Sequence, residues 1–193
     1  LAREDPHDVL MSAHPGGLDA LPRGSRVGTS SLRRKAQLLL KRPDLQIVDL
    51  RGNVDTRIAK VLERNELDAA VLACAGLERI GRADVITEKL GPDTMLPAPG
   101  QGALAIECRA DRTDVLAALK PLHHDITAAC VGAERALSRT LAGSCNVPLA
   151  GFGETTGARL RLRGYVGAPN GARHVAAETE GAQADAAALG EAL

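Results

Sequence analysis

Residues 27–57 contain the same unit twice, and this repeat limits what the chain can fold into. Each copy consists of a short apolar strand, a polar turn and a helix that has arginine in its first turn. The turns fall at residues 28–31 and 51–53. Strands that alternate with amphipathic helices are typical of a layered α/β fold that contains parallel strands.

A third copy follows the first two. Residues 68–74 form a continuous apolar run, which indicates a central parallel strand that is covered on both faces. We expect a turn at residues 75–79, with the basic Arg79 at its end. Residues 8–12 predict a further short strand. Together these segments predict a doubly wound α/β domain.

The placement of arginine is the first functional clue. The N-terminus of a helix carries partial positive charge, which disfavours Arg33, Arg34 and Arg57 in the first turns. Free backbone N–H groups at the same place already favour anions. A bound anion would relieve this concentration of positive charge. The alternative is that these arginines are ordinary solvated surface residues.

Charge and composition narrow the ligand class. Ligands of open α/β sheets bind beyond the carboxyl ends of the strands, where we expect the arginines to gather. Residues 23–79 hold twelve Lys and Arg against seven Asp and Glu, a net charge of +5 in a chain of net charge zero. With pI near 7.1 and 1% aromatic residues, the chain does not fit nucleic-acid binding, which uses stacked rings. A specific small anion fits better. The arginines concerned are Arg33, Arg34, Arg51, Arg57 and Arg79.

The second half has a different pattern. Two prolines and two glycines at residues 95–102 indicate a linker, and residues 103–108 predict a strand with only part of a sheet to join. The last third predicts a small α+β unit. Its expected elements are helices at 113–119, 125–141 and from about 183, with strands at 159–166 and 173–179.

The cysteines show no CxxC spacing, so we expect neither a zinc site nor a redox motif. Cys74, Cys108 and Cys130 lie in apolar periodic segments and are expected to be buried thiols. This usage suits a reducing cytoplasm. Cys145 differs, because the small residues before it and the proline after it indicate an accessible loop.

Other polar residues have plain structural interpretations. Ser30 and Ser31 have no base beside them in the sequence and are expected to cap a helix. His123 and His124 precede a helix and are expected to serve its start, not a metal. Cys145 follows a helix C-terminus, which disfavours the thiolate. A reaction at Cys145 therefore requires either a strong electrophile or nearby arginines that offset the dipole. The alternative is a loop cysteine without function.

Five motifs, taken in order, resemble the porphobilinogen deaminase family, also called the hydroxymethylbilane synthases. They are GTSSLRR (28–34), RGNVDTR (51–57), AGLERIG (75–81), LPAPGQGALAIECR (96–109) and LAGSCNVPL (141–149). The resemblance implies a transferase of tetrapyrrole (heme) biosynthesis, which joins four porphobilinogen molecules and releases ammonia at each step. It also implies a covalently bound dipyrromethane cofactor that primes the growing chain.

The resemblance assigns roles to residues. Cys145 matches the cysteine that holds the cofactor through a thioether. The five arginines match those that bind the acetate and propionate groups of the pyrroles, which suits a ligand that gains two carboxylates with each unit. Residues within the same motifs that are expected to assist are Thr29, Ser31, Asn53 and Gln101.

The resemblance also implies an architecture. We expect a periplasmic-binding-protein-like doubly wound α/β domain and a small C-terminal α+β domain that carries the cofactor cysteine. The expected division is 1–5 (end of domain 1 and hinge), 6–96 (domain 2), 97–120 (hinge and return segment of domain 1) and 121–193 (C-terminal domain). The expected protein is a cytoplasmic monomer with no nucleic-acid or membrane partner.

The resemblance also bears on whether this chain is active by itself. The family's catalytic aspartate would precede Leu1, so the chain resembles a fragment that is inactive alone, and none of its own carboxylates is assigned that role. The main alternative is a non-catalytic anion receptor of the periplasmic-binding-protein type. A receptor would have no use for a cysteine that holds a cofactor, so the loop around Cys145 favours the enzyme over the receptor.

Overall fold

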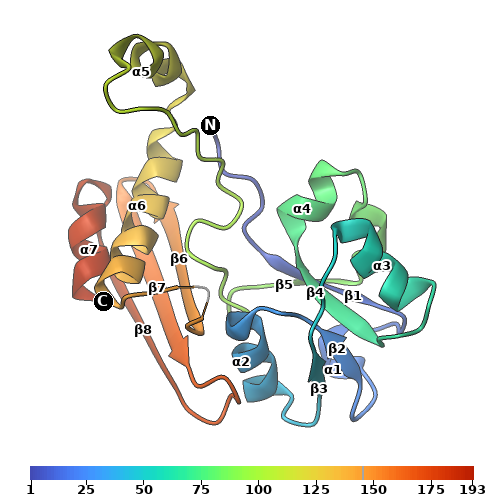
Figure 1. The fold of residues 1–193 in the computed structure, drawn as a ribbon. Helices are drawn as coiled ribbons and strands as arrows, with labels where there is room; N and C mark the ends of the chain where they lie inside the picture. The colour runs from blue at the N-terminus through green and yellow to red at the C-terminus, as the bar shows by residue number, and fades with distance from the viewer. Residues whose placement is uncertain (145) are drawn as a thin grey trace.

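The structure is a computed structural model that describes residues 1–144 and 146–193. It has two units, which are joined by extended segments (Figure 1). One unit is built on a 5-stranded sheet and the other on a 3-stranded sheet. The fold is therefore a mixed α/β arrangement with a parallel-containing sheet and a small antiparallel sheet.

The larger sheet has the strand order β3-β2-β4-β1-β5. Its strands are β1 (Asp8–Ser12), β2 (Arg26–Gly28), β3 (Gln46–Val48), β4 (Ala69–Ala73) and β5 (Glu88–Leu90). As predicted, β2, β3 and β4 run parallel. In contrast, β1 pairs antiparallel with both β4 and β5, so the sheet is mixed. β3 ends at Val48, before the turn that was predicted at residues 51–53.

Short helices connect the strands and cover the sheet (Figure 1). They are α1 (Gly17–Ala20), α2 (Leu32–Lys41), α3 (Val54–Leu62), α4 (Cys74–Arg79) and η1 (Ala83–Val85). The expectation of a turn at residues 75–79 is wrong, because they continue directly from β4 as α4. Arg79 consequently lies in the last turn of α4 and not in a first turn.

The two faces of the sheet pack against different helices. Side chains alternate along a strand, so neighbouring residues enter opposite cores. In β1, Val9 joins the cluster with Ile58 of α3, and Leu10 joins the cluster with Leu38 of α2. The β4 strand is buried on both faces, as its continuous apolar run predicted. Helix α3 therefore packs on one face of the sheet and helix α2 on the other.

The connecting segment differs from the prediction at one point. Residues 103–108 form neither helix nor strand, although a strand was expected there. Leu104 is 51% exposed and Ile106 53% exposed, and no strand among the described residues pairs with this apolar segment. Downstream, α5 (Thr113–Leu119) has the predicted bounds and continues into η2 (Lys120–Leu122).

The second unit packs two helices on an antiparallel sheet of order β6-β7-β8. Its elements are α6 (Asp125–Thr140), β6 (Leu149–Thr156), β7 (Arg159–Gly167), β8 (His174–Ala182), η3 (Gln183–Asp185) and α7 (Ala186–Ala192). The sequence predicted all of these except β6 and the short η3. Leu160 and Leu162 of β7 are fully buried against α6. None of the described helices combines the length and the apolar character needed to cross a bilayer.

A buried carboxylate joins the two units. Glu134 of α6 is fully buried and binds Arg3 through two ion-paired hydrogen bonds of 2.6 and 3.1 Å. It also accepts hydrogen bonds from the backbone N–H groups of Gly100 and Gly153. The N-terminal segment, the linker and β6 are therefore tied to one side chain of α6.

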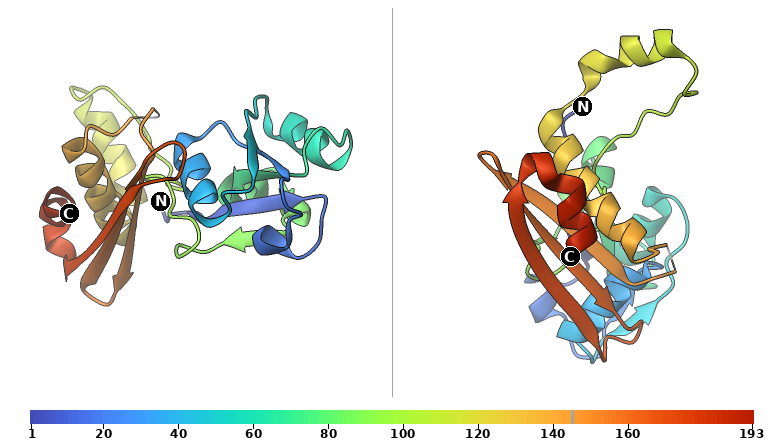
Figure 2. Two further views of the ribbon diagram at one scale, coloured as in Figure 1. Left: turned by 90° about the horizontal axis from the view of Figure 1, so that it is seen from below. Right: turned by 90° about the vertical axis from the view of Figure 1, so that its left-hand side faces the viewer.

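A second contact brings α2 against the antiparallel sheet (Figure 2). Ala36 of α2 packs in one apolar cluster with Phe152 and Tyr165. Arg163 of β7 reaches Asp93 beyond β5 at 3.0 Å. The arginines of α2 thus lie close to the place where the two units meet.

Candidate anion-binding site

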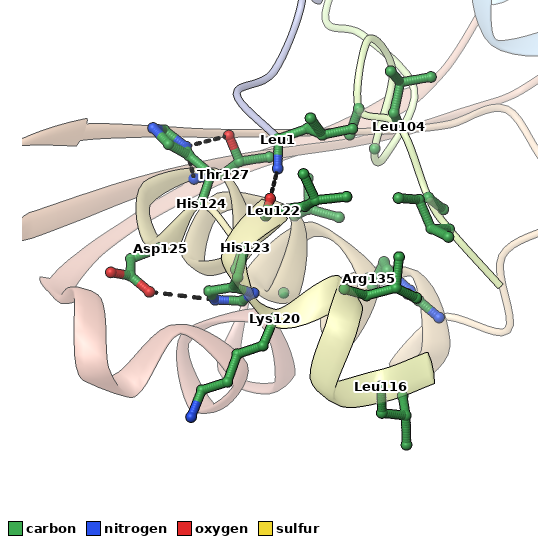
Figure 3. Close-up of a pocket in the computed structure, with 18 of the residues that line it drawn as sticks. Leu1, Leu104, Leu116, Lys120, Leu122, His123, His124, Asp125, Thr127 and Arg135 are labelled. Carbon is green, nitrogen blue, oxygen red and sulfur yellow. Dashed lines mark hydrogen bonds and ion pairs between the residues drawn. The ribbon is translucent and has the colours of Figure 1, made fainter. Parts of the chain in front are cut away.

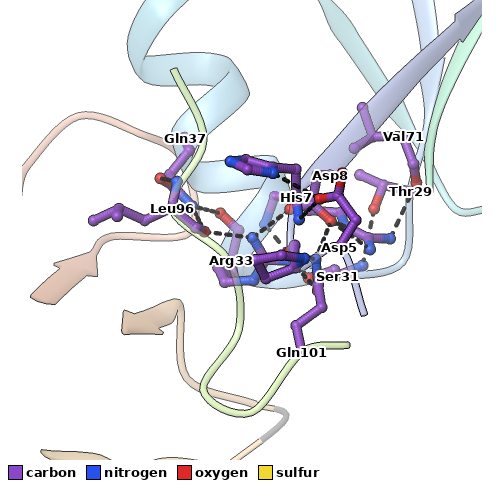
Figure 4. Close-up of polar contacts among 12 residues, drawn as sticks. Asp5, His7, Asp8, Thr29, Ser31, Arg33, Gln37, Val71, Leu96 and Gln101 are labelled. Carbon is purple, nitrogen blue, oxygen red and sulfur yellow. Dashed lines mark hydrogen bonds and ion pairs between the residues drawn. The ribbon is translucent and has the colours of Figure 1, made fainter. Parts of the chain in front are cut away.

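The first turn of α2, the start of β1 and the linker meet in one polar cluster (Figure 4). Asp8, at the start of β1, is fully buried between two arginines. Its Oδ2 accepts a hydrogen bond from Arg33 Nη1 at 2.6 Å. Its Oδ1 accepts hydrogen bonds from Arg34 Nε at 3.0 Å and from Arg34 Nη2 at 2.7 Å. One carboxylate therefore neutralises only part of the charge of two guanidinium groups.

The ionised form of Asp8 dominates in this cluster. Burial opposes ionisation, but the charges of Arg33 and Arg34 outweigh it and hold the pKa of Asp8 below its usual value. Burial also lowers the pKa of Arg33, although the Asp8 carboxylate opposes that shift. The cluster carries a net charge of +1, which favours a further anion.

Arg34 and Arg57 line the same small cavity. Its volume is about 180 Å³, and it lies among α2, α3 and the end of β4. Arg34 has five N–H groups, of which three bind Asp8 and the carbonyl of Val71. Arg57 donates one hydrogen bond, from Nε to the carbonyl of Gly52 at 2.8 Å. Both guanidinium groups thus retain donors that can bind a carboxylate.

Arg33 has a different environment from Arg34, although the two are adjacent. It is 5% exposed and is not among the residues around the cavity. Besides Asp8, it donates to the carbonyl of Leu96 at 2.6 Å and to Gln101 Oε1 at 3.2 Å. Its guanidinium group holds the linker against α2.

Gln101 connects the two segments that run between the units. Its Nε2 donates to the carbonyl of Pro6 at 2.6 Å and to Asp8 Oδ1 at 3.0 Å. Its backbone carbonyl accepts from Arg3 Nε at 2.9 Å. Gln101, one of the predicted site residues, thus lies in the arginine cluster, where it contacts Arg33 and Asp8.

The other polar residues of the motifs shape the turns. Ser31 is the N-cap of α2 and accepts from the backbone N–H of Arg34, and Asn53 caps α3 in the same way. The oxygen of the Thr29 side chain accepts from the backbone N–H of Ser31. The capping prediction is wrong for Ser30, whose hydroxyl bonds to the backbone of Leu50. His124 caps α6, as expected.

Arg51 and Arg79 lie on the surface. The side chain of Arg51 is 86% exposed, and its Nη2 lies 3.6 Å from Asp49 Oδ2. Arg79 is exposed at the end of α4. Neither lines the cavity of Arg34 and Arg57. The structure thus brings Arg34 and Arg57 together and leaves these two outside the cavity.

The thiols differ in burial. Cys74 and Cys130 are buried, as predicted. Cys108 is half-buried, which corrects the expectation of a core thiol, because the strand predicted around it does not form. Cys145, the predicted cofactor residue, lies outside the described residues.

One group of possible metal ligands occurs among the described residues. Atoms of Asp5, Cys74 and Glu78 lie within 4.8 Å of one another. The ammonium group of Lys89 already binds Asp5 at 2.5 Å. Burial raises the pKa of Cys74 to about 12, so its thiol is protonated at neutral pH. This arrangement is a charge pair beside a neutral thiol.

A larger cavity of about 1,330 Å³ lies between the linker and the start of α6 (Figure 3). Its wall is largely apolar and includes Leu104, Ile106 and Leu116. Arg34 and Arg57 do not line it. Its chemistry does not suit a polycarboxylate as well as the smaller, arginine-lined cavity does.

Sequence reasoning missed Asp8 and Glu134. Asp8 was placed in a short strand and Glu134 on a helix, and neither was considered as a partner for arginine. The available signal was an acidic residue within otherwise apolar segments, since acidic side chains are rarely buried unless they are paired.

Comparison with known proteins places these features in one family. Residues 1–117 match the family model described as "Porphobilinogen deaminase, dipyromethane cofactor binding domain". Residues 128–193 match the model described as "Porphobilinogen deaminase, C-terminal domain". Neither description names a receptor, so the alternative of a non-catalytic anion receptor has no support.

Two curated relatives cover nearly the whole chain. The porphobilinogen deaminase of Ralstonia nicotianae is 54% identical over 194 residues, which is 98% of this chain and 58% of the relative. That of Xanthomonas euvesicatoria pv. vesicatoria is 50% identical over 190 residues, which is 98% of this chain and 62% of the relative. The chain thus spans about three fifths of the length of these relatives. With both family models matched in order along it, the chain belongs to the porphobilinogen deaminase family.

Proposed function

We propose that the protein containing this chain is a transferase that joins four porphobilinogen molecules into the linear tetrapyrrole hydroxymethylbilane, with release of ammonia. The observation that carries the proposal is the small cavity lined by Arg34 and Arg57, whose guanidinium groups retain free donors. It lies within the residues that match the cofactor-binding domain of the family.

The residues fit a pyrrole ligand that carries carboxylates. A dipyrromethane cofactor, joined to Cys145 by a thioether, supplies the first two pyrrole rings onto which further units are added. Arg34 and Arg57 bind carboxylates, because guanidinium groups form strong charge-assisted hydrogen bonds with them. The exposed Arg51 and Arg79 bind carboxylates of the growing chain outside the cavity.

The remaining predicted residues act on the shape of the site. Ser31 and Asn53 cap the helices that carry Arg34 and Arg57. Thr29 supports the turn before α2, and Gln101 ties the linker to Asp8. Arg33 contributes positive potential and holds the linker. These roles keep the donors of the cavity in place before a ligand arrives, which lowers the cost of binding.

The proposed architecture follows the same division. Residues 6–96 form a lobe of periplasmic-binding-protein type, residues 1–5 and 97–120 connect it to a further domain, and residues 121–193 carry Cys145. The two segments that leave the larger sheet side by side, linked through Gln101 and Pro6, support this division. We propose a cytoplasmic monomer, which suits thiols that remain unpaired among the described residues.

The arginine assignment is tested in the complete enzyme. Arg34→Leu and Arg51→Leu should each reduce conversion of porphobilinogen or arrest it at a shorter chain. Arg82→Leu is the control, because Arg82 pairs with Asp84 at the surface away from the cavity. Chain length is measured by mass spectrometry of the intact enzyme. Wild-type turnover in both Leu variants would contradict the proposal.

The cofactor assignment has an independent test. Cys145→Ser should remove the covalent mass increment of the cofactor, since a serine hydroxyl is a far weaker nucleophile than a thiol. Cys74→Ala, Cys108→Ala and Cys130→Ala are the controls and should retain it in folded protein. If the Cys145→Ser protein keeps the added mass of the cofactor, the cofactor is bound to another residue and this part of the proposal is refuted.

A further inference from the structure

We infer that Asp8 is a positioning residue that gives the two adjacent arginines different tasks. It holds Arg33 as a buried tie to the linker and orients Arg34 towards the ligand carboxylate. The inference rests on the proposed function, since it concerns how the same cavity binds its anion. It predicts that Arg33 does not touch the ligand.

The contacts of Arg33 hold it away from the cavity, which it does not line. Both N–H groups of its Nη1 are used, one by Asp8 and one by the carbonyl of Leu96, each at 2.6 Å. Its Nη2 binds Gln101 Oε1. A ligand could reach Arg33 only if the linker moved away from α2. Arg33 is therefore part of the frame of the site.

The contacts of Arg34 fix a plane and leave donors free. All three of its nitrogen atoms bind, Nε and Nη2 to Asp8 Oδ1 and Nη1 to the carbonyl of Val71. Because the guanidinium group is planar, three contacts on three atoms prevent its rotation. Each terminal nitrogen keeps one N–H group for the cavity that Arg34 shares with Arg57.

The position of Asp8 in the sheet makes this orientation specific. Asp8 pairs with Ala73 across β1 and β4, and Ala73 also lines the cavity. Asp8 is thus held in the sheet opposite a residue of the cavity wall. Without it, Arg34 must be ordered when the ligand binds, and ordering one such side chain weakens binding about two- to twelvefold (about 0.5–1.5 kcal/mol).

The test measures the rotation of guanidinium groups by ¹⁵N NMR in the complete protein without ligand. In the unaltered chain, Arg34 should show slow rotation about the Cζ–Nε bond. Arg57 should rotate faster, because only its Nε has a hydrogen bond among the described residues. Equally fast rotation of Arg34 would overturn the inference, and this comparison needs no variant.

The matched variant is Asp8→Asn combined with Arg33→Gln. It removes one negative and one positive charge, so the cluster keeps its net charge of +1 and avoids a second unpaired guanidinium group. We expect fast rotation of Arg34 and a two- to twelvefold higher Kd for porphobilinogen. Asp44→Asn is the control, because it breaks a similar two-bond pair with Arg42 that lies outside the cavity. It should change neither quantity.

A binding cycle separates orientation from general stability. If Asp8 acts through Arg34, the double substitution should weaken porphobilinogen binding in the wild-type chain and have no further effect in an Arg34→Gln chain. The same fold-change in both backgrounds would reduce Asp8 to a structural role and refute the inference. Failure of the proposed function looks different, because Arg34→Gln alone would then leave the Kd for porphobilinogen unchanged.

Discussion

Replacing Glu134 by glutamine should be among the most destabilising conservative changes in this chain. Oε1 of Glu134 accepts from Arg3 Nη1 at 2.6 Å and from the Gly153 N–H at 2.8 Å. Oε2 accepts from Arg3 Nη2 at 3.1 Å and from the Gly100 N–H at 2.6 Å. A glutamine side chain must place its NH₂ group against one of these two pairs of donors, whichever way the amide is turned.

The expected magnitude follows from burial. Glu134 is fully buried, and the side chain of Arg3 is 11% exposed. Removing one partner of a buried ion pair costs about 3–5 kcal/mol, since the other charge remains without compensation. A displaced glycine N–H adds to this, at about 1–3 kcal/mol for an unsatisfied buried donor. We expect a loss of at least about 3 kcal/mol in the free energy of unfolding.

The assay is urea unfolding, followed by circular dichroism. Glu154→Gln is the control, because Glu154 pairs with Arg163 while 44% of its side chain is exposed. An exposed pair contributes about 0–1 kcal/mol. A loss below about 1 kcal/mol for Glu134→Gln would refute the reasoning, since it would mean that the four hydrogen bonds contribute no more than a surface pair does.

A double-substitution cycle identifies the cause of the loss. Arg3→Met removes the guanidinium group but leaves Glu134 with the two glycine N–H groups. If the uncompensated charge of Arg3 dominates the cost, Arg3→Met with Glu134→Gln should be less destabilising than the sum of the two single changes. Strict additivity would show that the two side chains do not act as a pair.

Three further predictions concern stability and reactivity. Because the folded pKa of Asp8 lies below its ordinary value of 3.8, its stabilising contribution is complete at neutral pH and is lost as the pH falls below about 4. Asp8→Asn should therefore flatten the free energy of unfolding against pH in that range, and an unchanged slope would contradict this. Gly190→Ala should cost about 1–3 kcal/mol, since its Cβ would lie 2.2 Å from the carbonyl oxygen of Ala133. Gly132→Ala, inside α6 with open space, should instead stabilise by about 0.5–1 kcal/mol in the same thermal unfolding assay. At pH 8, iodoacetamide should modify the half-buried Cys108 before the buried Cys74, as peptide mass spectrometry would detect; the reverse order would refute the burial argument.

Local patterns accounted for much of the fold. The periodicity of residues 32–40 predicted α2, and Ser31 before it was correctly interpreted as the cap. The continuous apolar run at 68–74 predicted β4 as a strand buried on both faces. These features follow from the nearest few residues, because helical and strand periods are local properties of the chain.

Elements that depend on distant partners were predicted less well. Residues 103–108 have the composition of a strand, but a strand requires a neighbour that accepts its hydrogen bonds, and the described chain places none beside it. The direction of β1 in the sheet was likewise set by its pairing with β4 and β5, whose paired residues lie 57 or more positions away in the sequence. A single sequence gives no direct signal for such pairing.

The two adjacent arginines show the same limit at the site. By itself, the sequence determined that Arg33 and Arg34 begin a helix and that their charge opposes its dipole. Only the tertiary structure decided that Arg33 is a buried tie and that Arg34 faces a cavity with Arg57. The physical reason is that Asp8 comes from β1, 25 residues before Arg33, and its carboxylate binds the two neighbouring side chains in different ways.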